Sequence, residues 1–156
     1  FTLDYSILHM GGSIEVWKDP EIGVELDWYQ NLQDYTKNDS IAANLRDQRQ
    51  GLVASLRVGH LKKKKDWKFR LTYTRLERFS AVDYLAQNDW ARWDYSSQGS
   101  LDGRLTNYKG FEAMIGYMIS DNIKVNSRYF IVEQLVPFGP FNESGQRIRF
   151  DIDIGF

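Results

Sequence analysis

The last ten residues, 147–156, read Arg-Ile-Arg-Phe-Asp-Ile-Asp-Ile-Gly-Phe, so that charged or glycine residues alternate with apolar ones at every step. Successive side chains of a β-strand point to opposite faces, and this two-residue period is therefore typical of a strand with one apolar and one polar face. The segment predicts a terminal strand whose charged row and apolar row are completely separated.

The same alternation recurs in six segments upstream and predicts an all-β antiparallel meander of seven strands. Asp121-Asn122, between two alternating runs, predicts a hairpin turn. The expected strands lie near residues 1–17, 22–31, 51–61, 67–78, 110–120, 123–134 and 147–156, in one segment, 1–156, without a linker.

The first strand is the least regular, because its apolar positions change from odd to even near Ile7 and Leu8. A β-bulge near these two residues would produce such a change. A hairpin at Gly11-Gly12 is the alternative and would give eight strands. The strand after it would have about six residues, fewer than the 9 to 11 that a membrane crossing needs, so one long strand is expected.

Composition limits the classes of function. The 156 residues are 42% apolar and 26% charged, with no Cys, which describes a folding chain of single-domain length. The formal charge of −1 gives no reason to expect nucleic acid as a partner. Apolar runs end after four or five residues, so a helical membrane protein is not expected. The chain begins at Phe1, from which we expect a processed, trimmed or partial polypeptide.

The connections between the expected strands alternate in length, and this favours an outer-membrane β-barrel. The short ones are 18–21, 61–66 and 121–122, whereas 31–50, 79–109 and 136–146 are long. Outer-membrane barrels have tight periplasmic turns at one end and long loops at the other. A soluble sheet that is apolar on one face also alternates and is the alternative. Charges at mid-strand and aromatic residues at both strand ends favour the membrane barrel.

The ending Ile152-Asp153-Ile154-Gly155-Phe156 is similar to the last strand of bacterial outer-membrane proteins, whose terminal Phe is read by the barrel-assembly machinery. More of the chain resembles a bacterial outer-membrane family of predicted porins. The similar stretches, which together cover most of the chain, are 22–31, 56–59 with 66–69, 73–77 and 106–111. Residues Asn88-Asp89-Trp90 differ from the acidic-serine-acidic pattern expected in the family's loop.

The resemblance implies a larger barrel, of about 16 to 18 strands, with this sequence as its C-terminal part. It implies an outer-membrane location with the C-terminus and short turns in the periplasm, and Phe156 as the assembly signal. The expected partners are outer-membrane lipid, the assembly machinery, and further strands from the same polypeptide or from other chains. No cofactor, metal or nucleic acid is expected.

In a wide barrel, solutes would diffuse through a hydrated lumen whose wall charges set the selectivity. The residues predicted to line the pore are the charges of the polar rows: Glu25, Asp27, Arg57, Lys68, Arg70, Glu112, Lys124, Arg128, Arg149, Asp151 and Asp153. The residues predicted to face lipid are those of the apolar rows: Leu26, Trp28, Leu56, Phe69, Leu71, Ile115, Tyr117, Ile148, Phe150, Ile152 and Ile154. The wall charges could select or orient solutes, or simply pair across the strands.

Two further features have open interpretations. Residues 62–65 are four consecutive lysines, which we read as a solvated turn in preference to an anion site. The loop 79–109 contains Trp90, Trp93 and Tyr95, which could offer stacking platforms to a sugar; the alternative, which we expect, is that the loop folds inward as a constriction.

Two rival functions remain. A scaffold barrel in a multiprotein complex is the first. An outer-membrane enzyme is the second, and it is not expected, because only His9 and His60 could serve as a base and no Gly-x-Ser-x-Gly motif occurs.

Overall fold

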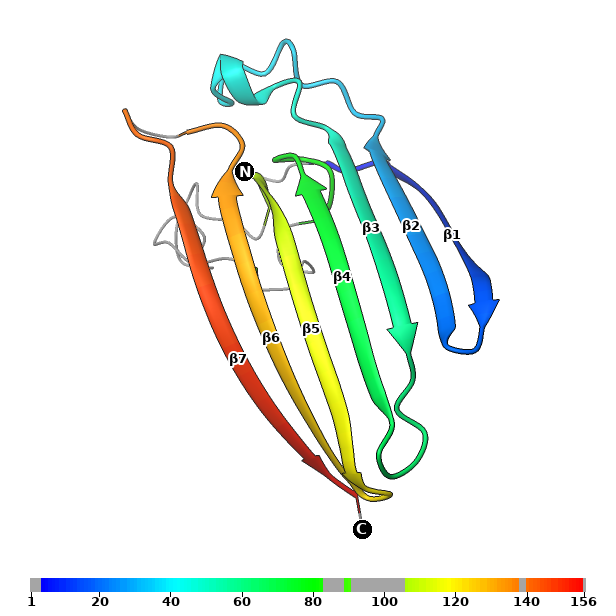
Figure 1. Cartoon of the computed structure of the whole chain (residues 1–156). Helices are drawn as coiled ribbons and strands as arrows, with labels where there is room; N and C mark the ends of the chain where they lie inside the picture. The colour runs from blue at the N-terminus through cyan, green and yellow to red at the C-terminus, as the bar shows by residue number, and fades with distance from the viewer. Residues whose placement is uncertain (1–3, 83–88, 91–105, 138–139, 156) are drawn as a thin grey trace.

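The computed structural model of the protein describes residues 4–82, 89–90, 106–137 and 140–155. These residues form one seven-stranded antiparallel sheet in which each strand pairs with the next along the chain (Figure 1). The strands are β1 (Ile7–Lys18), β2 (Glu21–Asn31), β3 (Gln50–Gly59), β4 (Trp67–Leu76), β5 (Tyr108–Ser120), β6 (Ile123–Gln134) and β7 (Ser144–Ile154). The all-β meander of seven strands is therefore confirmed.

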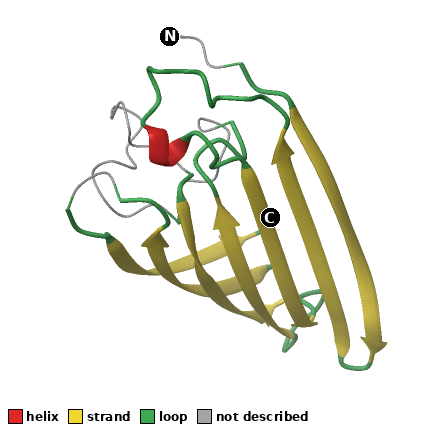
Figure 2. Ribbon diagram, turned by 90° about the horizontal axis from the view of Figure 1, so that it is seen from above, coloured by secondary structure: helices red, strands yellow, loops and turns green. Residues whose placement is uncertain are grey.

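The sheet is curved and open. Figure 2 shows the strands bent into a trough, with the loops gathered at one end. Strands β1 and β7 are the two edges and do not pair with each other, so the seven described strands do not close into a barrel. Among the described residues, the one helical element is the three-residue 3-10 helix η1 (Ala43–Leu45), and no helix is long and apolar enough to span a membrane.

The first strand differs from the prediction in its start and in its bulge. It begins at Ile7, because Tyr5 before it packs against a loop cluster and takes no place in the sheet. The register shift lies between Glu15 and Trp17, so the expected bulge near Ile7 and Leu8 is wrong. The apolar pair Val16 and Trp17 are both largely exposed there. Gly11-Gly12 lie inside one continuous strand, as expected.

Two other strands are longer at their loop ends than the alternation indicated. β5 starts at Tyr108, two residues before the expected 110, and β7 starts at Ser144, three before the expected 147. In both cases the extra residues continue the ladder with β6, through the pairs Tyr108 with Gln134 and Ser144 with Glu133. Backbone pairing extends a strand whether or not its side chains alternate.

The buried core lies at the loop end of the sheet. One cluster joins Leu76, Tyr108, Phe130 and Val132 of three neighbouring strands to Trp90 of the long loop. A second cluster, of Tyr35, Ile41, Leu45 and Phe79, holds the loops together above the strands.

Asn31 ties the loops to the end of β2. This fully buried side chain donates hydrogen bonds to the Tyr35 hydroxyl and to the Phe79 carbonyl oxygen, both at 2.9 Å. Its Oδ1 accepts from the backbone N–H groups of Ser6 and Gln33. A buried amide with both ends satisfied holds these segments in one arrangement.

Candidate charged face of the sheet

The two faces of the sheet have opposite chemistry. We call the face on which Asp89 and Trp90 lie the inner face, and the opposite face the outer face. Every residue predicted to line a pore lies on the inner face, and every residue predicted to face lipid lies on the outer face. Side chains alternate between the two faces along each strand, and the pairing register keeps this alternation in phase across all seven strands. Their roles in a pore or in lipid remain predictions.

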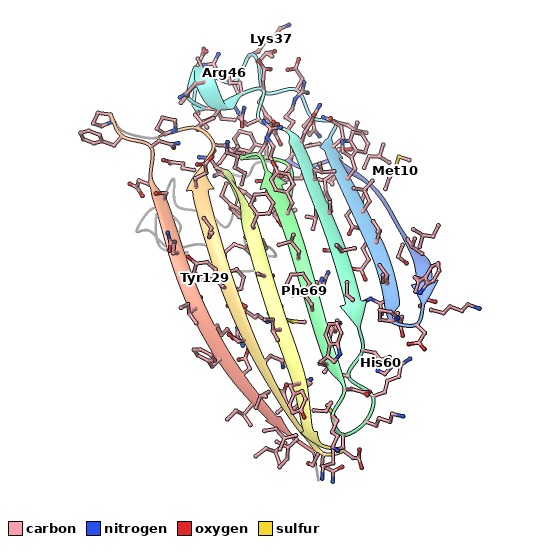
Figure 3. The ribbon with its side chains drawn as sticks, in the orientation of Figure 1. Met10, Lys37, Arg46, His60, Phe69 and Tyr129 are labelled. Atoms are coloured by element: carbon pink, nitrogen blue, oxygen red, sulfur yellow. The ribbon has the colours of Figure 1, made fainter. Side chains whose placement is uncertain are left out.

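The outer face is apolar and exposed. One row of directly paired residues crosses the whole sheet without a charged side chain: Ile14, Val24, Leu56, Leu71, Ala113, Tyr129 and Ile148. Phe150 and Ile152 of β7 are 76% and 68% exposed. Phe69 and Tyr129, labelled in Figure 3, belong to this face and come from β4 and β6. An exposed apolar surface across seven strands is far larger than water-soluble monomers usually carry.

The apolar band has a defined height. Along β5 it runs from Phe111 to Ile119, eight residue steps or about 27 Å at a strand rise of about 3.4 Å. At the loop end it stops at a charged row, in which Arg75 pairs with Lys109 and Lys109 with Glu133. The Lys109 and Glu133 side chains form an ion pair at 2.6 Å. The band is therefore bounded by charges on its loop side.

The inner face carries a row of arginines. Arg57, Arg70, Arg128 and Arg149 lie in one register row that is interrupted by Met114 of β5. Arg57 is directly opposite Arg70, and Arg128 is directly opposite Arg149. Like charges in direct cross-strand pairs destabilise a sheet, so this row needs anions close by.

Carboxylates of the same face supply these anions. Arg57 contacts Glu21 at 2.5 Å and Glu15 at 3.8 Å. Arg70 contacts Glu25 at 2.9 Å, and Arg149 contacts Asp151 at 2.8 Å. The interpretation that the inner-face charges pair with one another therefore holds for these groups. For Arg57 and Arg70 the pairing is possible because β2 carries the acidic side chains and the neighbouring strands β3 and β4 carry the arginines.

Other predicted wall residues are placed less uniformly. Lys124 pairs with Asp153 at 3.1 Å, and Asp27 lies 2.8 Å from His9, whose ring stacks on Tyr29. Lys68 forms no ion pair with any residue that the structure describes. Its register row contains Gly59, Gly116, Asn126 and Asp151.

Asp89 brings the long loop onto the arginine row. Its carboxylate is 7% exposed and accepts two hydrogen bonds from Arg149 Nη1, at 2.7 and 2.9 Å. Nη1 of Arg147 and Nη1 of Arg128 lie 3.5 and 3.8 Å from it. Trp90, the next residue, packs edge-on against Phe130. This part of the loop therefore lies against the inner face, whereas Trp93 and Tyr95 lie outside the described residues.

The predicted pore-lining set did not include several charged residues that also lie on the inner face, among them Glu15, Glu21, Asp89 and Arg147. Arg147 is two residues before Arg149 in the terminal alternation, so the rule that placed Arg149 on the inner face could also have placed Arg147 there. No local pattern could have identified Asp89, because its contacts are with a strand about 60 residues further along the chain. Phe156, the predicted assembly signal, lies outside the described residues.

The lysine-rich connection 61–66 is a tight turn held by Asp66. Its carboxylate accepts hydrogen bonds from the backbone N–H groups of Lys62 and Lys63, and it lies 2.7 Å from His60 Nδ1. Burial raises the pKa of Asp66, but the two backbone donors and His60 outweigh it and hold this pKa below the ordinary value. The contacts favour the turn interpretation over an anion site.

Among the residues that the structure describes, the contacts of the two histidines form no recognisable catalytic or metal-binding arrangement. His9 lies in β1 and contacts Asp27, whereas His60 follows the end of β3 and contacts Asp66. Within the described part of the chain, no group of three or more His, Asp or Glu side chains could hold a metal ion.

Comparison with models of protein families, with curated proteins and with solved structures gives no match. The resemblance of this sequence to outer-membrane porins therefore stays a prediction.

Proposed function

We propose that this sheet is part of the wall of an outer-membrane β-barrel, through which small hydrophilic solutes diffuse along the charged inner face. One observation carries the proposal: an exposed apolar band covers one face of seven strands and is about 27 Å high along β5. The lipid-facing band of outer-membrane barrels is about 25 Å tall. In water such a face would aggregate, whereas in a bilayer it is solvated.

The open edges support a larger assembly. Backbone groups at an unpaired strand edge cost several kcal/mol each in hydrocarbon, so β1 and β7 would need neighbours in the membrane. In this proposal those neighbours are further strands of the same polypeptide or of other chains. The tight turns 19–20, 60–66 and 121–122 lie at the opposite end from the long loops, as expected for the periplasmic side.

A pair of single cysteines tests which face meets lipid. The chain has no Cys, and Asn126 and Ser127 are small polar neighbours on opposite faces of β6. In proteoliposomes, a membrane-impermeant thiol reagent should modify Asn126→Cys and leave Ser127→Cys unmodified. A fluorophore on Ser127→Cys should in turn be quenched by brominated lipids. Reversed labelling, or quenching at neither site, would refute the membrane orientation.

Planar-bilayer recording of the full polypeptide then tests transport. Stepwise ohmic conductance is expected from an open channel. A scaffold barrel is the second candidate, and it is favoured by one observation, the anchoring of Asp89 and Trp90 across the inner face. Correct cysteine labelling without conductance would support the scaffold and reject the channel.

A further inference from the structure

A pocket of about 670 Å³ lies on the inner face and is chemically divided into two ends. At the loop end its lining is mostly apolar and includes Leu76, Trp90 and Tyr108, with His9 in the same register row as Leu76 and Tyr108. At the other end the lining contains Arg70, Glu112 and Arg128. The volume is in the range of small-molecule sites, which typically combine apolar walls with a few placed polar groups.

The charged end has a fixed geometry. Arg70 and Arg128 flank Met114 in the register, on the strands either side of it, so their backbones are two strand spacings or about 10 Å apart. Glu112 lies two residues along β5 from Met114, on the same face. An acid therefore lies between two bases on three adjacent strands.

All three groups have unused hydrogen-bonding capacity. The Nε atoms of Arg70 and Arg128 are buried and have no hydrogen-bond partner. No described residue donates a hydrogen bond to the Glu112 carboxylate, and the nearest cation, Arg128 Nε, is 3.7 Å away. Buried polar groups without partners are costly, and the side chains of Arg70, Arg128 and Glu112 are still 38%, 28% and 13% exposed, so a ligand that supplies both an anion and a cation can bind all three together.

The charges around the pocket nearly cancel. Arg70 contacts Glu25 at 2.9 Å, and Arg128 lies within 4 Å of both Glu112 and Asp89. A balanced site gives no net attraction to an anion or a cation, whereas a dipolar solute can bind both signs at once. A separate apolar end offers room for a side chain.

We propose that this pocket binds a zwitterionic solute with an apolar side chain, an α-amino acid or a dipeptide. The carboxylate binds Arg70 and Arg128, the ammonium group binds Glu112, and the side chain lies toward Leu76, Trp90 and Tyr108. This inference rests on the proposed function, since it names the solute class of the same channel.

A matched series of small molecules tests the proposal on the unmodified full-length protein. Binding of L-phenylalanine, phenylalanyl-phenylalanine, 3-phenylpropionate and 2-phenylethylamine is measured by calorimetry in detergent and by block of the single-channel current. At least one zwitterion should bind about tenfold or more tightly than the molecules lacking one charge, because each missing group forfeits a charge-assisted hydrogen bond. Equal or tighter binding of 3-phenylpropionate would overturn the proposal in favour of an anion site.

Single substitutions test which side chain of the pocket binds which charged group of the solute. Glu112→Gln should abolish the preference for L-phenylalanine over 3-phenylpropionate, and Arg128→Gln should abolish its preference over 2-phenylethylamine. Lys37→Gln, on the exposed loop labelled in Figure 3, removes a charge elsewhere and should change neither preference. Unchanged preferences in folded pocket variants would overturn the assignment, with folding checked by circular dichroism.

The two proposals fail separately. Conductance without binding of any molecule in the series would refute the pocket as a zwitterion site and leave the channel intact. Calorimetric binding of a zwitterion with no conductance would retain the site and reject the channel.

Discussion

Asp89 is the residue through which a distant loop acts on the charge of the inner face. Three arginines lie within 4 Å of its carboxylate, which is almost completely buried. Charge-assisted hydrogen bonds in such a setting are stronger than neutral ones. The carboxylate therefore offsets positive charge on the inner face at the point where β6 and β7 meet.

Replacing Asp89 by Asn should make the proposed channel more anion-selective. The substitution removes the negative charge and leaves Arg128, Arg147 and Arg149 in place. A unit charge acts on an ion about 4 Å away with about 1 kcal/mol in water, a factor of about five for each ion and of opposite sign for anions and cations, so the anion-to-cation permeability ratio should rise by up to about 25-fold. Reversal potentials in a salt gradient measure this ratio.

The matched control is Asp39→Asn, which removes a carboxylate that is 97% exposed on the loop between β2 and β3. It should leave the permeability ratio unchanged. A ratio in Asp89→Asn that equals the wild-type ratio, or that moves toward cations, would show that Asp89 does not act on permeating ions.

Asp66 should make the lysine-rich turn sensitive to acid. Its pKa is lowered in the folded protein, so its stabilising effect is fully present above the ordinary carboxyl pKa of about 3.9 and is lost as the pH falls through the lowered folded value. Amide hydrogen exchange of Lys62 and Lys63, corrected for the intrinsic rate, should accelerate over this acid range. Asp66→Asn should remove the pH dependence, and Asp19→Asn, in another turn, should retain it.

Strand β5 presents the apolar band at several depths, and this allows a test at the scale of one element. Ile115 lies near the middle of the band and Ile119 near its turn end, both on the outer face and both at least half exposed. Ile115→Arg should lower the free energy of unfolding by about 2 to 4 kcal/mol in bilayers, and Ile119→Arg by about 1 kcal/mol or less. Denaturant titration in liposomes measures both. Equal costs at the two depths would argue that water or protein, and not lipid, contacts this face.

The same strand illustrates how far alternation could predict the structure. Its period fixes the face of Ile115 and Glu112, because side-chain direction in a strand depends only on parity. In β1, the alternation could not locate the bulge between Glu15 and Trp17, because an extra residue shifts the alternation wherever pairing with the neighbouring strand favours it. It also could not place Asp89, whose position depends on contacts far along the chain. The strands and their two faces could thus be predicted from local sequence, whereas the position of Asp89 and Trp90 and the pocket that Trp90 lines could not.

At the scale of the whole molecule, the curvature and the open edges of the sheet both indicate that further strands are needed to complete a barrel. The sheet bends so that its charged face is enclosed on one side, while β1 and β7 remain unpaired at its margins (Figure 2). In water, unpaired edges are hydrated; in hydrocarbon they are not. The charged inner face can line a hydrated bore only if other strands complete the wall.

Completion of the wall predicts a specific pattern of hydrogen exchange. In an open antiparallel sheet, every second amide of an edge strand points away from its neighbour and exchanges rapidly. In the membrane-inserted full polypeptide, all central amides of β1 and β7 should instead exchange as slowly as those of β4, the internal control paired on both sides. The comparison is made in nanodiscs by residue-resolved exchange. Fast exchange at alternate positions of β1 and β7, with β4 protected, would mean that the edges stay open, and an open sheet of this kind could not be part of a transmembrane wall.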